Sequence, residues 1–333
     1  MKLTVGIPTF NRAGWLGTAI ENVLMQSFTD FRLIVSDNAS EDNTPEVVGS
    51  FADDRISYIR SERNIGSLGN LNRLIDLADT EYLLLLPDDD VLYPGHLQAA
   101  VDLLDRSGKI GLAHSAFDLI DAESRVVQRV EPVQSRSPAM IETGDAALER
   151  LMVSPWGLGY PSVVYRTDAI RQAGGLREEE GQFGDMAMWM RIALDWDFGY
   201  IAKPGAGFRI HPERVTDELM AQHGVTSEGR ERVLMFAQLI YEQRTEFLGY
   251  APLETRRERW LRALAQLQLL KENAAEGLPS SDVAAGVTGI VRTSPRILRR
   301  RALWRLVVAQ LGARRARSAL RKLRRRPPVG SEA

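Results

Sequence analysis

The sequence predicts an α/β fold in which a mixed, mainly parallel sheet is flanked by helices and followed by a helical C-terminal extension. Three observations support this prediction. Short apolar runs alternate with helical patterns through the first half of the chain, as in proteins built on parallel sheets. Residues 82–86 are apolar throughout, which is typical of a strand buried on both faces. After about residue 212 the strand patterns end and helical patterns continue.

The first half opens with a strand at residues 3–8 and a helix at residues 13–26. In that helix an apolar face repeats at the helical period, formed by Leu16, Ala19, Ile20, Val23 and Leu24. The other elements expected here are strands at residues 31–37, 56–60 and 82–86 and helices at residues 67–78 and 95–105. Right-handed crossovers between these strands make them parallel.

The second half begins with two strands that read as a hairpin, so we expect the sheet to become mixed. The expected elements are strands at 110–119, 126–130, 198–201 and 207–211 and helices at 143–153, 167–173, 185–195, 232–247, 253–270 and 295–322. We therefore predict two regions, an α/β body at residues 1–215 and a helical C-terminal region at residues 216–333.

Composition is that of an ordinary globular protein. Of 333 residues, 44% are hydrophobic and 26% are charged, which excludes a mainly disordered chain. There is no cysteine, so disulfides, thiolate metal sites and cysteine nucleophiles are excluded. The first ten residues lack the pattern of a signal peptide, and no apolar run is long enough to cross a bilayer, so we expect a cytoplasmic protein.

Polar residues follow three of the predicted parallel strands. In open α/β sheets, ligands bind outside the carboxyl ends of the strands, so these residues are expected to share one cleft. They are residues 8–12 (Pro-Thr-Phe-Asn-Arg), residues 36–38 (Ser-Asp-Asn) and Asp88, Asp89 and Asp90.

The acidic cluster Asp88–Asp89–Asp90 is the sharpest single feature. Three neighbouring carboxylates repel and raise one another's pKa unless a cation lies among them. Hard oxygen ligands select Mg²⁺ or Mn²⁺, and magnesium commonly bridges to substrate phosphates. The alternative is a solvated loop or a helix N-terminus, where acidic residues are also favoured.

Four weaker candidates have a structural interpretation beside the functional one. Asp37 and the Arg63–Asn64 pair fit a turn or contacts to a nucleoside. Asp185 fits an N-terminal helix cap or a general base at a helix that faces the cleft. His211, after a short strand, fits a structural histidine or a site residue.

Taken together, these segments resemble the inverting GT-A glycosyltransferases of family 2, including those similar to spore-coat polysaccharide transferases. The resemblance covers roughly residues 2–215, and the order and spacing of its motifs are more specific than any one of them. The matching stretches are VGIPTFNR (5–12), QSF (26–28), FRLIVSDNASEDNT (31–44), RNIG (63–66) with Asn72, LLLLPDDD (83–90), SVVYR (162–166), GGL (174–176), Gly184–Asp185 with Trp189 and Arg191, and His211. One departure is that the first acid of the family's Asp-x-Asp motif falls on Pro87, so Asp88 or Asp90 takes its place.

The resemblance implies a Rossmann-like GT-A domain that binds a nucleotide sugar and carries out catalysis. Its site residues carry over one by one. Nucleoside contacts fall on Pro8, Thr9, Asn11, Asp37, Arg63 and Asn64. Asp88 is implied to lie by the ribose, phosphates and metal, Asp89 to ligate Mn²⁺ or Mg²⁺, His211 to lie near the diphosphate and to act as a third metal residue, and Asp185 to be the catalytic base.

The implied reaction is hexosyltransferase-type transfer from a nucleotide-diphosphate sugar to an acceptor hydroxyl. The donor expected first is a UDP-sugar, with dTDP- and GDP-sugars as alternatives, and the acceptor is a carbohydrate, a lipid-linked molecule or a small molecule. The implied role is in polysaccharide or glycoconjugate biosynthesis.

The C-terminal tail is strongly basic. Residues 291–333 contain fourteen Lys or Arg and one acidic residue, a net +13, which leaves −15 for the rest of a chain whose total is −2. The tail fits peripheral contact with an anionic membrane, a solvated helix, or docking on the acidic body of its own or a second subunit in a homodimer. Nucleic-acid binding is not expected, because aromatic platforms are lacking around the arginines.

Two other classes were weighed. A sugar-nucleotide nucleotidylyltransferase needs a glycine-rich phosphate loop after the first strand, and residues 7–10 (Ile-Pro-Thr-Phe) are not one. A phosphoacceptor signalling module would not need Gly184–Asp185 or the long C-terminal half. A catalytically silent nucleotide-sugar-binding scaffold remains open from sequence alone.

Overall fold

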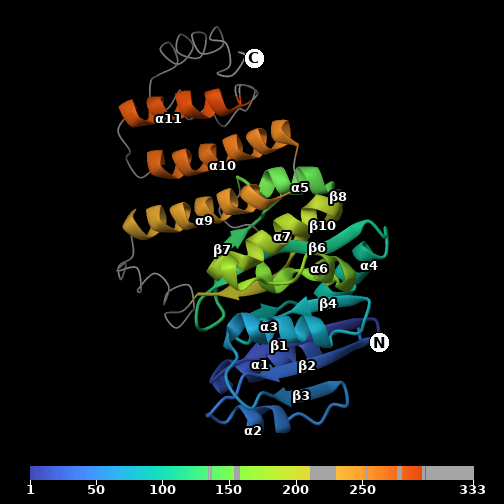
Figure 1. Cartoon of the computed structure of the whole chain (residues 1–333). Coiled ribbons are helices and arrows are strands. Elements are labelled where there is room, and N and C mark those ends of the chain that lie inside the picture. Colours follow the sequence, from blue (N-terminus) through green and yellow to red (C-terminus); the bar gives the residue numbers. More distant parts are fainter. Residues whose placement is uncertain are drawn as a thin grey trace. The chain divides into compact units, whose positions relative to one another are not determined.

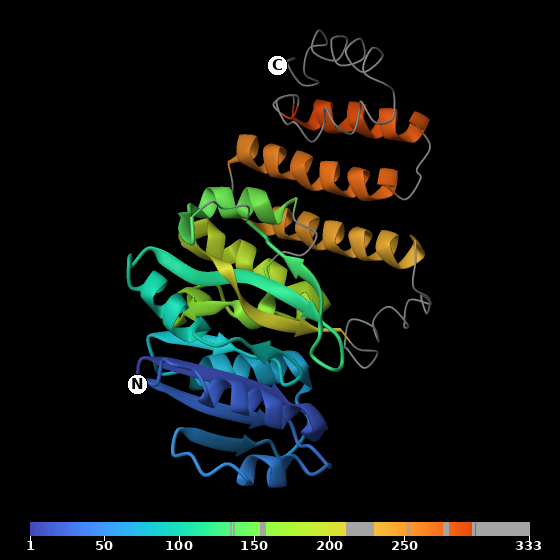
Figure 2. The ribbon, with the colours of Figure 1, turned by 180° about the vertical axis from the view of Figure 1, so that it is seen from behind.

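The computed structural model describes residues 1–133, 135, 137–153, 158–210, 230–251, 254–275, 280–294 and 297 (Figures 1 and 2). The chain divides into two compact units. The first contains a ten-stranded sheet with the order β3-β2-β1-β4-β9-β6-β10-β5, in which β7 pairs with β6 and β8 with β10. The α/β class and the mixed, mainly parallel sheet predicted from the sequence are confirmed.

Four parallel strands form the first half of the sheet. They are β1 (Leu3–Thr9), β2 (Phe31–Asp37), β3 (Ile56–Arg60) and β4 (Tyr82–Leu85). Thr9, the last residue of β1, pairs with Asp37, the last residue of β2. Because the strands run in the same direction, their carboxyl ends meet at one edge of the sheet, as predicted.

The second half of the sheet is mixed. Its strands are β5 (Val91–Leu92), β6 (Ile110–Ile120), β7 (Val126–Val130), β8 (Ala139–Glu142), β9 (Val164–Arg166) and β10 (Asp197–Arg209). β9 is antiparallel to both β4 and β6, whereas β10 runs parallel to β6. The predicted hairpin of β6 and β7 is confirmed.

Four strands differ from the prediction. The two short strands expected at 198–201 and 207–211 are a single strand, β10, with a register shift against β6 between Ile201 and Ala206. The Lys203–Pro204–Gly205 stretch looks like a break in the sequence, but it is an irregularity within a continuous strand. β5, β8 and β9 were not predicted, because strands of two to four residues carry too little alternation to be recognised.

Helices flank the sheet. They are α1 (Ala13–Leu24), α2 (Thr44–Gly49), α3 (Gly66–Leu77), α4 (His96–Leu104), α5 (Gly144–Leu151), α6 (Thr167–Gln172) and α7 (Gly184–Asp195), with short 3₁₀ helices η1 (Tyr160–Ser162) and η2 (Glu178–Phe183). All were predicted within a few residues except α2, η1 and η2.

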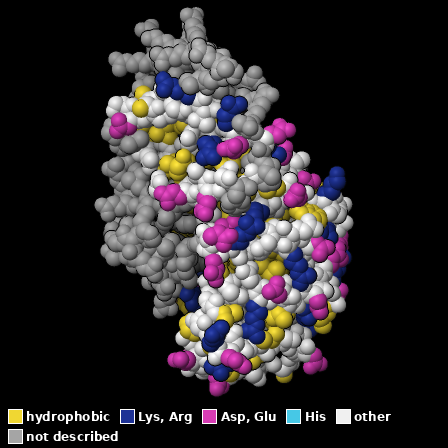
Figure 3. Space-filling view, viewed as in Figure 1, with side chains coloured by type: hydrophobic (Ala, Val, Ile, Leu, Met, Phe, Trp, Pro, Cys, Tyr) yellow, Lys and Arg dark blue, Asp and Glu magenta, His cyan; other side chains and the backbone are white. Residues whose placement is uncertain are grey.

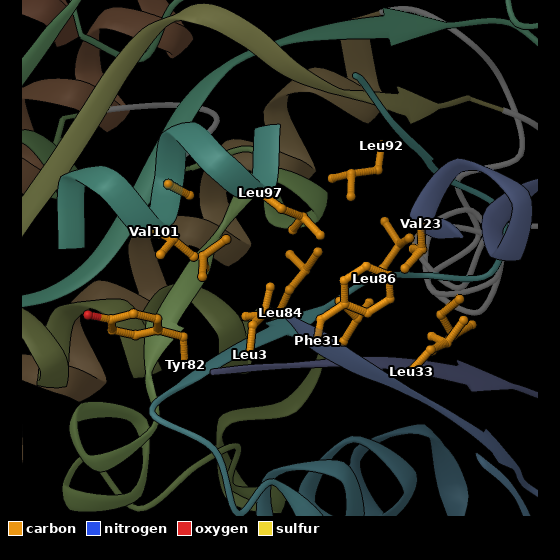
Figure 4. Packing of buried hydrophobic residues seen from close by; sticks show 14 of the residues in the cluster. Leu3, Val23, Phe31, Leu33, Tyr82, Leu84, Leu86, Leu92, Leu97 and Val101 are labelled. Carbon is orange, nitrogen blue, oxygen red and sulfur yellow. The ribbon is translucent and has the colours of Figure 1, made fainter. Parts of the chain in front are cut away.

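The main core lies where α1 and α4 pack on the sheet (Figure 4). Leu3 of β1 and Leu84 of β4 contribute from the sheet, Val23 from α1, and Leu97 and Val101 from α4, all buried. Each such side chain stabilises the fold by roughly 1.5–3 kcal/mol relative to an exposed one. This packing fixes the strand ends from which the polar residues project.

The second unit contains α9 (Arg230–Tyr250), α10 (Thr255–Ala275) and α11 (Ser280–Thr293), which lie side by side in Figures 1 and 2. They confirm the helical character expected at 232–247 and 253–270. The expected helix at 295–322 apart from Ile297, the basic tail beyond that residue, and His211 lie outside the described residues. The boundary at 215/216 also falls there, so the two-region division stays a prediction. None of the described helices has the length and apolar character needed to span a bilayer.

Candidate functional site

The carboxyl edge of the parallel strands brings together the residues expected there. The backbone N–H of Asn38 donates to the carbonyl of Thr9 at 2.9 Å, which joins the loops that follow β1 and β2. The N–H of Leu86 donates to the carbonyl of Gly6, which carries the β4 run forward beside β1 to the acidic cluster. Pro8, Thr9 and Asp37 therefore lie at the same edge as the acidic cluster.

Asp37 is fully buried, and both of its carboxylate oxygens accept hydrogen bonds from the protein. Oδ1 accepts from the N–H of Ser40 at 2.8 Å, and Oδ2 accepts from the Tyr58 hydroxyl at 2.5 Å. The Arg60 guanidinium lies 3.4 Å from Oδ2. Asp37 therefore stabilises a turn, as in the structural interpretation of this residue. A carboxylate has about four lone-pair positions, so acceptor capacity remains for a ligand.

Asn64 is tied to the end of β2 through Asn38. The Asn38 amide donates to Asn64 Oδ1 at 2.7 Å, and Asn64 Oδ1 also accepts from the N–H of Gly66 at 2.8 Å. Gly66 has φ +79°, a left-handed conformation that favours glycine. Arg63, just before this turn, is exposed, so its side chain stands at the rim of the edge rather than within it.

Asn11 has a structural task that the sequence did not reveal. Its φ of 54° is in the left-handed region, which Asn tolerates better than most residues. Its N–H donates to the Ser40 hydroxyl at 2.9 Å, and its Oδ1 accepts from the N–H of Glu41 at 2.7 Å. Asn11 therefore joins the loop after β1 to the loop after β2, and its predicted nucleotide contact stays a prediction.

Two arginines hold the acidic cluster, whose three residues are at most 6% exposed. Arg12 Nη1 lies 2.5 Å from Asp89 Oδ2 and 3.9 Å from Asp88 Oδ1. The backbone N–H of Arg209 donates to Asp90 Oδ1 at 2.8 Å, and its guanidinium donates to the Asp89 carbonyl at 2.7 Å. Sequence reasoning quoted Arg12 in a motif but gave it no role, and it missed Arg209, which no pattern in the sequence marks.

The carboxylates of the acidic cluster repel one another. Burial and the charge of Asp89 raise the pKa of Asp88 to about 7, and the nearby Thr9 hydroxyl and the charge of Arg12 only partly oppose this. This agrees with the expectation that neighbouring carboxylates raise one another's pKa. A further positive charge at the cluster would therefore be stabilising.

The donor set suits a metal only if a ligand completes it. Among the described residues, no three His, Asp or Glu side chains are grouped so as to hold an ion, and Asp90 is directed to the Arg209 backbone. Asp88 and Asp89 remain as a two-carboxylate set. Mg²⁺ is commonly bound by one or two carboxylates together with substrate phosphates, so these residues fit a cation that arrives with a diphosphate.

Asp185 is the second residue of α7 and is half-buried. Its Oδ1 accepts a hydrogen bond from the N–H of Met186 at 2.7 Å. Neighbouring groups nevertheless enclose the carboxyl, and this burial raises its pKa to about 6. A base for an acceptor hydroxyl works best with a pKa near the operating pH, and Asp185 meets that condition.

Tyr160 links Asp185 to the acidic cluster and was not found from the sequence. Burial raises the pKa of Tyr160 well above its usual value, and the charges of Tyr165, Asp185 and Asp90 raise it further. One hydroxyl therefore lies within electrostatic reach of both Asp185 and the acidic cluster. No signal in the sequence marks it, because η1 is a single 3₁₀ turn between β8 and β9.

Residues 4–144 match the sequence model of the family described as Glycosyl transferase family 2. One relative is a GalNAc(5)-diNAcBac-PP-undecaprenol beta-1,3-glucosyltransferase of Campylobacter jejuni, 40% identical over 116 residues, which are 34% of this chain and 36% of the relative. The matched segment thus spans about a third of that relative.

Two solved structures resemble the whole chain. TarS of S. aureus in complex with UDP-GlcNAc has a TM-score of 0.59 at 16% identity, covering 97% of this chain and 89% of that one. The mannosyltransferase PcManGT from Pyrobaculum calidifontis, in complex with GDP-Man and Mn²⁺, has a TM-score of 0.51 at 15% identity, covering 97% and 87%. These similarities confirm the GT-A fold expected from the sequence.

Proposed function

We propose that this chain, whose residues 4–144 match the model of glycosyl transferase family 2, transfers a sugar from a nucleotide-diphosphate donor to an acceptor hydroxyl with inversion. The observation that carries the proposal is that η1 packs against β4 and β5, the strands that the acidic cluster connects, while the ring of Tyr160 in η1 contacts that of Trp189, one helical turn after Asp185 on α7. An inverting transfer needs these two parts, one for the leaving diphosphate and one for the attacking hydroxyl.

The donor nucleoside is assigned to the loops after β1 and β2. Pro8, Thr9 and Asp37 lie together there, and Asn64 is tied to the same loop. The UDP-GlcNAc complex of TarS supports a UDP-sugar as the first donor to test, and the GDP-Man complex of PcManGT keeps GDP-sugars as the alternative.

A divalent cation is assigned to Asp88 and Asp89. When bound, it supplies Lewis-acid stabilisation of the negative charge that develops on the leaving diphosphate. The Mn²⁺ in the PcManGT complex supports Mn²⁺ as the ion to test first. His211, the third residue assigned to the metal, lies outside the described residues.

Asp185 acts on the acceptor. As ionised carboxylate it accepts the proton of the acceptor hydroxyl, whose oxygen forms the new bond to the anomeric carbon. The bond from that carbon to the diphosphate oxygen breaks at the same time, and its electron pair leaves with the diphosphate. A single displacement inverts the anomeric centre and needs no covalent intermediate.

The name of the Campylobacter relative describes a lipid-linked acceptor, which supports lipid-linked acceptors for this chain beside carbohydrates and small molecules. Peripheral membrane contact, a homodimer and a cytoplasmic location stay predictions.

Release of nucleoside diphosphate from UDP-glucose, UDP-GlcNAc and GDP-mannose with Mn²⁺ tests the proposal. We expect turnover with at least one donor, and turnover reduced about 10²–10⁴-fold in Asp185→Asn. Asp195→Asn, an exposed position at the other end of α7, is the matched control and should keep its rate. Equal rates in wild type and Asp185→Asn would remove Asp185 as the base, and no release from any donor would count against the transferase.

A further inference from the structure

Tyr160 lies between the acidic cluster and α7. Its turn, η1, packs against β4 and β5, the two strands that the acidic cluster connects along the chain. Its ring centroid is 6.2 Å from that of Trp189. Trp189 is one helical turn after Asp185 on α7, so the two share a face of that helix.

The Tyr160 hydroxyl is shielded from solvent and has no hydrogen-bond partner among the described residues. Buried polar groups in native proteins nearly always have a partner, and one that lacks it is costly. The neighbouring Tyr165 shows the ordinary case, because its hydroxyl accepts a hydrogen bond from Trp189 Nε1 at 2.9 Å. The two neighbouring tyrosines therefore differ, because the Tyr165 hydroxyl has a hydrogen-bond partner and the Tyr160 hydroxyl has none among the described residues.

The hydroxyl is held as a donor. Burial first, and then the charges of Tyr165, Asp185 and Asp90, raise the pKa of Tyr160 well above its usual value. It therefore keeps its proton at any physiological pH and suits a ligand oxygen that accepts a hydrogen bond.

The in-line geometry of an inverting transfer indicates which part of the ligand lies beside Tyr160. The base and the leaving diphosphate stand on opposite faces of the anomeric carbon, so the transferred sugar lies between Asp185 and the acidic cluster. Tyr160 is positioned between the same two groups. We propose that the Tyr160 hydroxyl donates a hydrogen bond to an oxygen of the transferred sugar, and that Tyr160 thereby contributes to the choice of donor sugar. This inference rests on the proposed function.

Calorimetric titrations in the presence of Mn²⁺ separate the sugar from the nucleotide. UDP-GlcNAc is compared with UDP, and GDP-mannose with GDP, on wild type, Tyr160→Phe and the matched control Tyr165→Phe. The ratio of the Kd of each nucleotide sugar to that of its nucleotide should rise about 3- to 10-fold in Tyr160→Phe, which is the loss of one hydrogen bond. It should stay within about twofold of wild type in Tyr165→Phe.

Three outcomes overturn the proposal. An unchanged ratio in Tyr160→Phe, with both ligands still bound, removes the inference and leaves the proposed function standing. An equal loss for nucleotide and nucleotide sugar assigns the hydroxyl to the diphosphate instead. No nucleotide binding by wild type removes the donor site itself, and the inference with it.

Stability of the ligand-free protein gives a second, independent readout. Removing a hydroxyl that has no partner should leave the midpoint of urea unfolding unchanged or raise it in Tyr160→Phe, whereas Tyr165→Phe breaks the bond from Trp189 and should lower it. A lowered midpoint in Tyr160→Phe would reveal a structural partner and overturn the assignment to the sugar.

Discussion

At the scale of single residues, burial sets the protonation of the two assigned catalytic groups. Asp185 has a pKa of about 6 against a usual value of 3.8, and burial is the largest cause. Asp88 has a pKa of about 7 for the same reason, with the charge of Asp89 added. These environments cannot be read from the sequence, which supplies the carboxylates but not the side chains that enclose them.

We predict that turnover rises with pH up to about 6 and is constant at higher pH. Below that pH Asp185 holds a proton and cannot accept one from the acceptor hydroxyl. The pH dependence of kcat measures this. An acid limb near pH 4 would mean that the working carboxyl is an ordinary solvated one.

The raised pKa of Asp185 also predicts how stability depends on pH. Because the pKa of Asp185 is raised, the folded protein holds a proton that the unfolded chain releases, so this group loses stabilising effect as pH rises from about 4 to about 6. Asp185→Asn should therefore be at least as stable as wild type at pH 8, while its turnover is lost. Urea unfolding of both proteins at pH 5 and pH 8 checks this, and a variant less stable at pH 8 would contradict it.

Arg12 is predicted to act as the counter-charge of the acidic cluster. Arg12→Met removes the guanidinium that pairs with the Asp88 and Asp89 carboxylates and should lower the free energy of unfolding by about 1–3 kcal/mol, less than for a fully buried pair because Arg12 is 21% exposed. Added Mn²⁺ should restore part of that loss. Arg125→Met, whose ion pairs are at the surface, is the control and should leave the free energy of unfolding nearly unchanged. Equal costs would contradict the counter-charge role.

At the scale of elements, the sequence predicts those parts of the fold that local pattern dictates. β1, β2 and β4 are runs of buried apolar residues, and α1 repeats its apolar face at the helical period. The site residues at the ends of these strands were predicted for the same reason. The sequence does not predict β8, β9 and η1, because their conformations depend on partners distant in sequence. Tyr160 was missed because it lies in η1.

The long β10 depends on close packing at Gly205. A Cβ there would lie 2.0 Å from the His96 ring and 2.6 Å from Ser115 Oγ. Gly205→Ala should therefore lower the free energy of unfolding by about 1–3 kcal/mol, as for other overpacked positions. Gly108→Ala, where a Cβ meets nothing within 4 Å, is the control in urea unfolding. A neutral Gly205→Ala would show that the strand can shift to make room.

At the scale of the whole molecule, charge is unevenly distributed along the chain but mixed on the described surface. On the face in Figure 3, acidic and basic side chains are interspersed over the described residues. The basic tail lies outside them, and with it the part of the sequence that bears on partners. How the tail is used could not be predicted, because its composition fits a membrane, its own body or a second subunit equally well.

The membrane hypothesis predicts that the full chain sediments with vesicles containing anionic lipid, and that a chain lacking residues 298–333 does not. Each Lys or Arg near an anionic surface contributes about 1 kcal/mol, and salt weakens the attraction. Vesicles of neutral lipid are the control. Equal sedimentation of the two chains would leave the tail to another role.

The central claim is that a nucleotide donor binds at the carboxyl edge of the parallel strands with a divalent cation at Asp88 and Asp89. Calorimetric titration of UDP with and without Mn²⁺, on wild type, on Asp89→Ala and on Asp79→Ala, whose side chain is 75% exposed, tests it most directly. We expect manganese-dependent binding in wild type and Asp79→Ala that is lost in Asp89→Ala. If UDP, dTDP and GDP all fail to bind wild type with Mn²⁺ present, or if Asp89→Ala binds as well as wild type, the claim is contradicted.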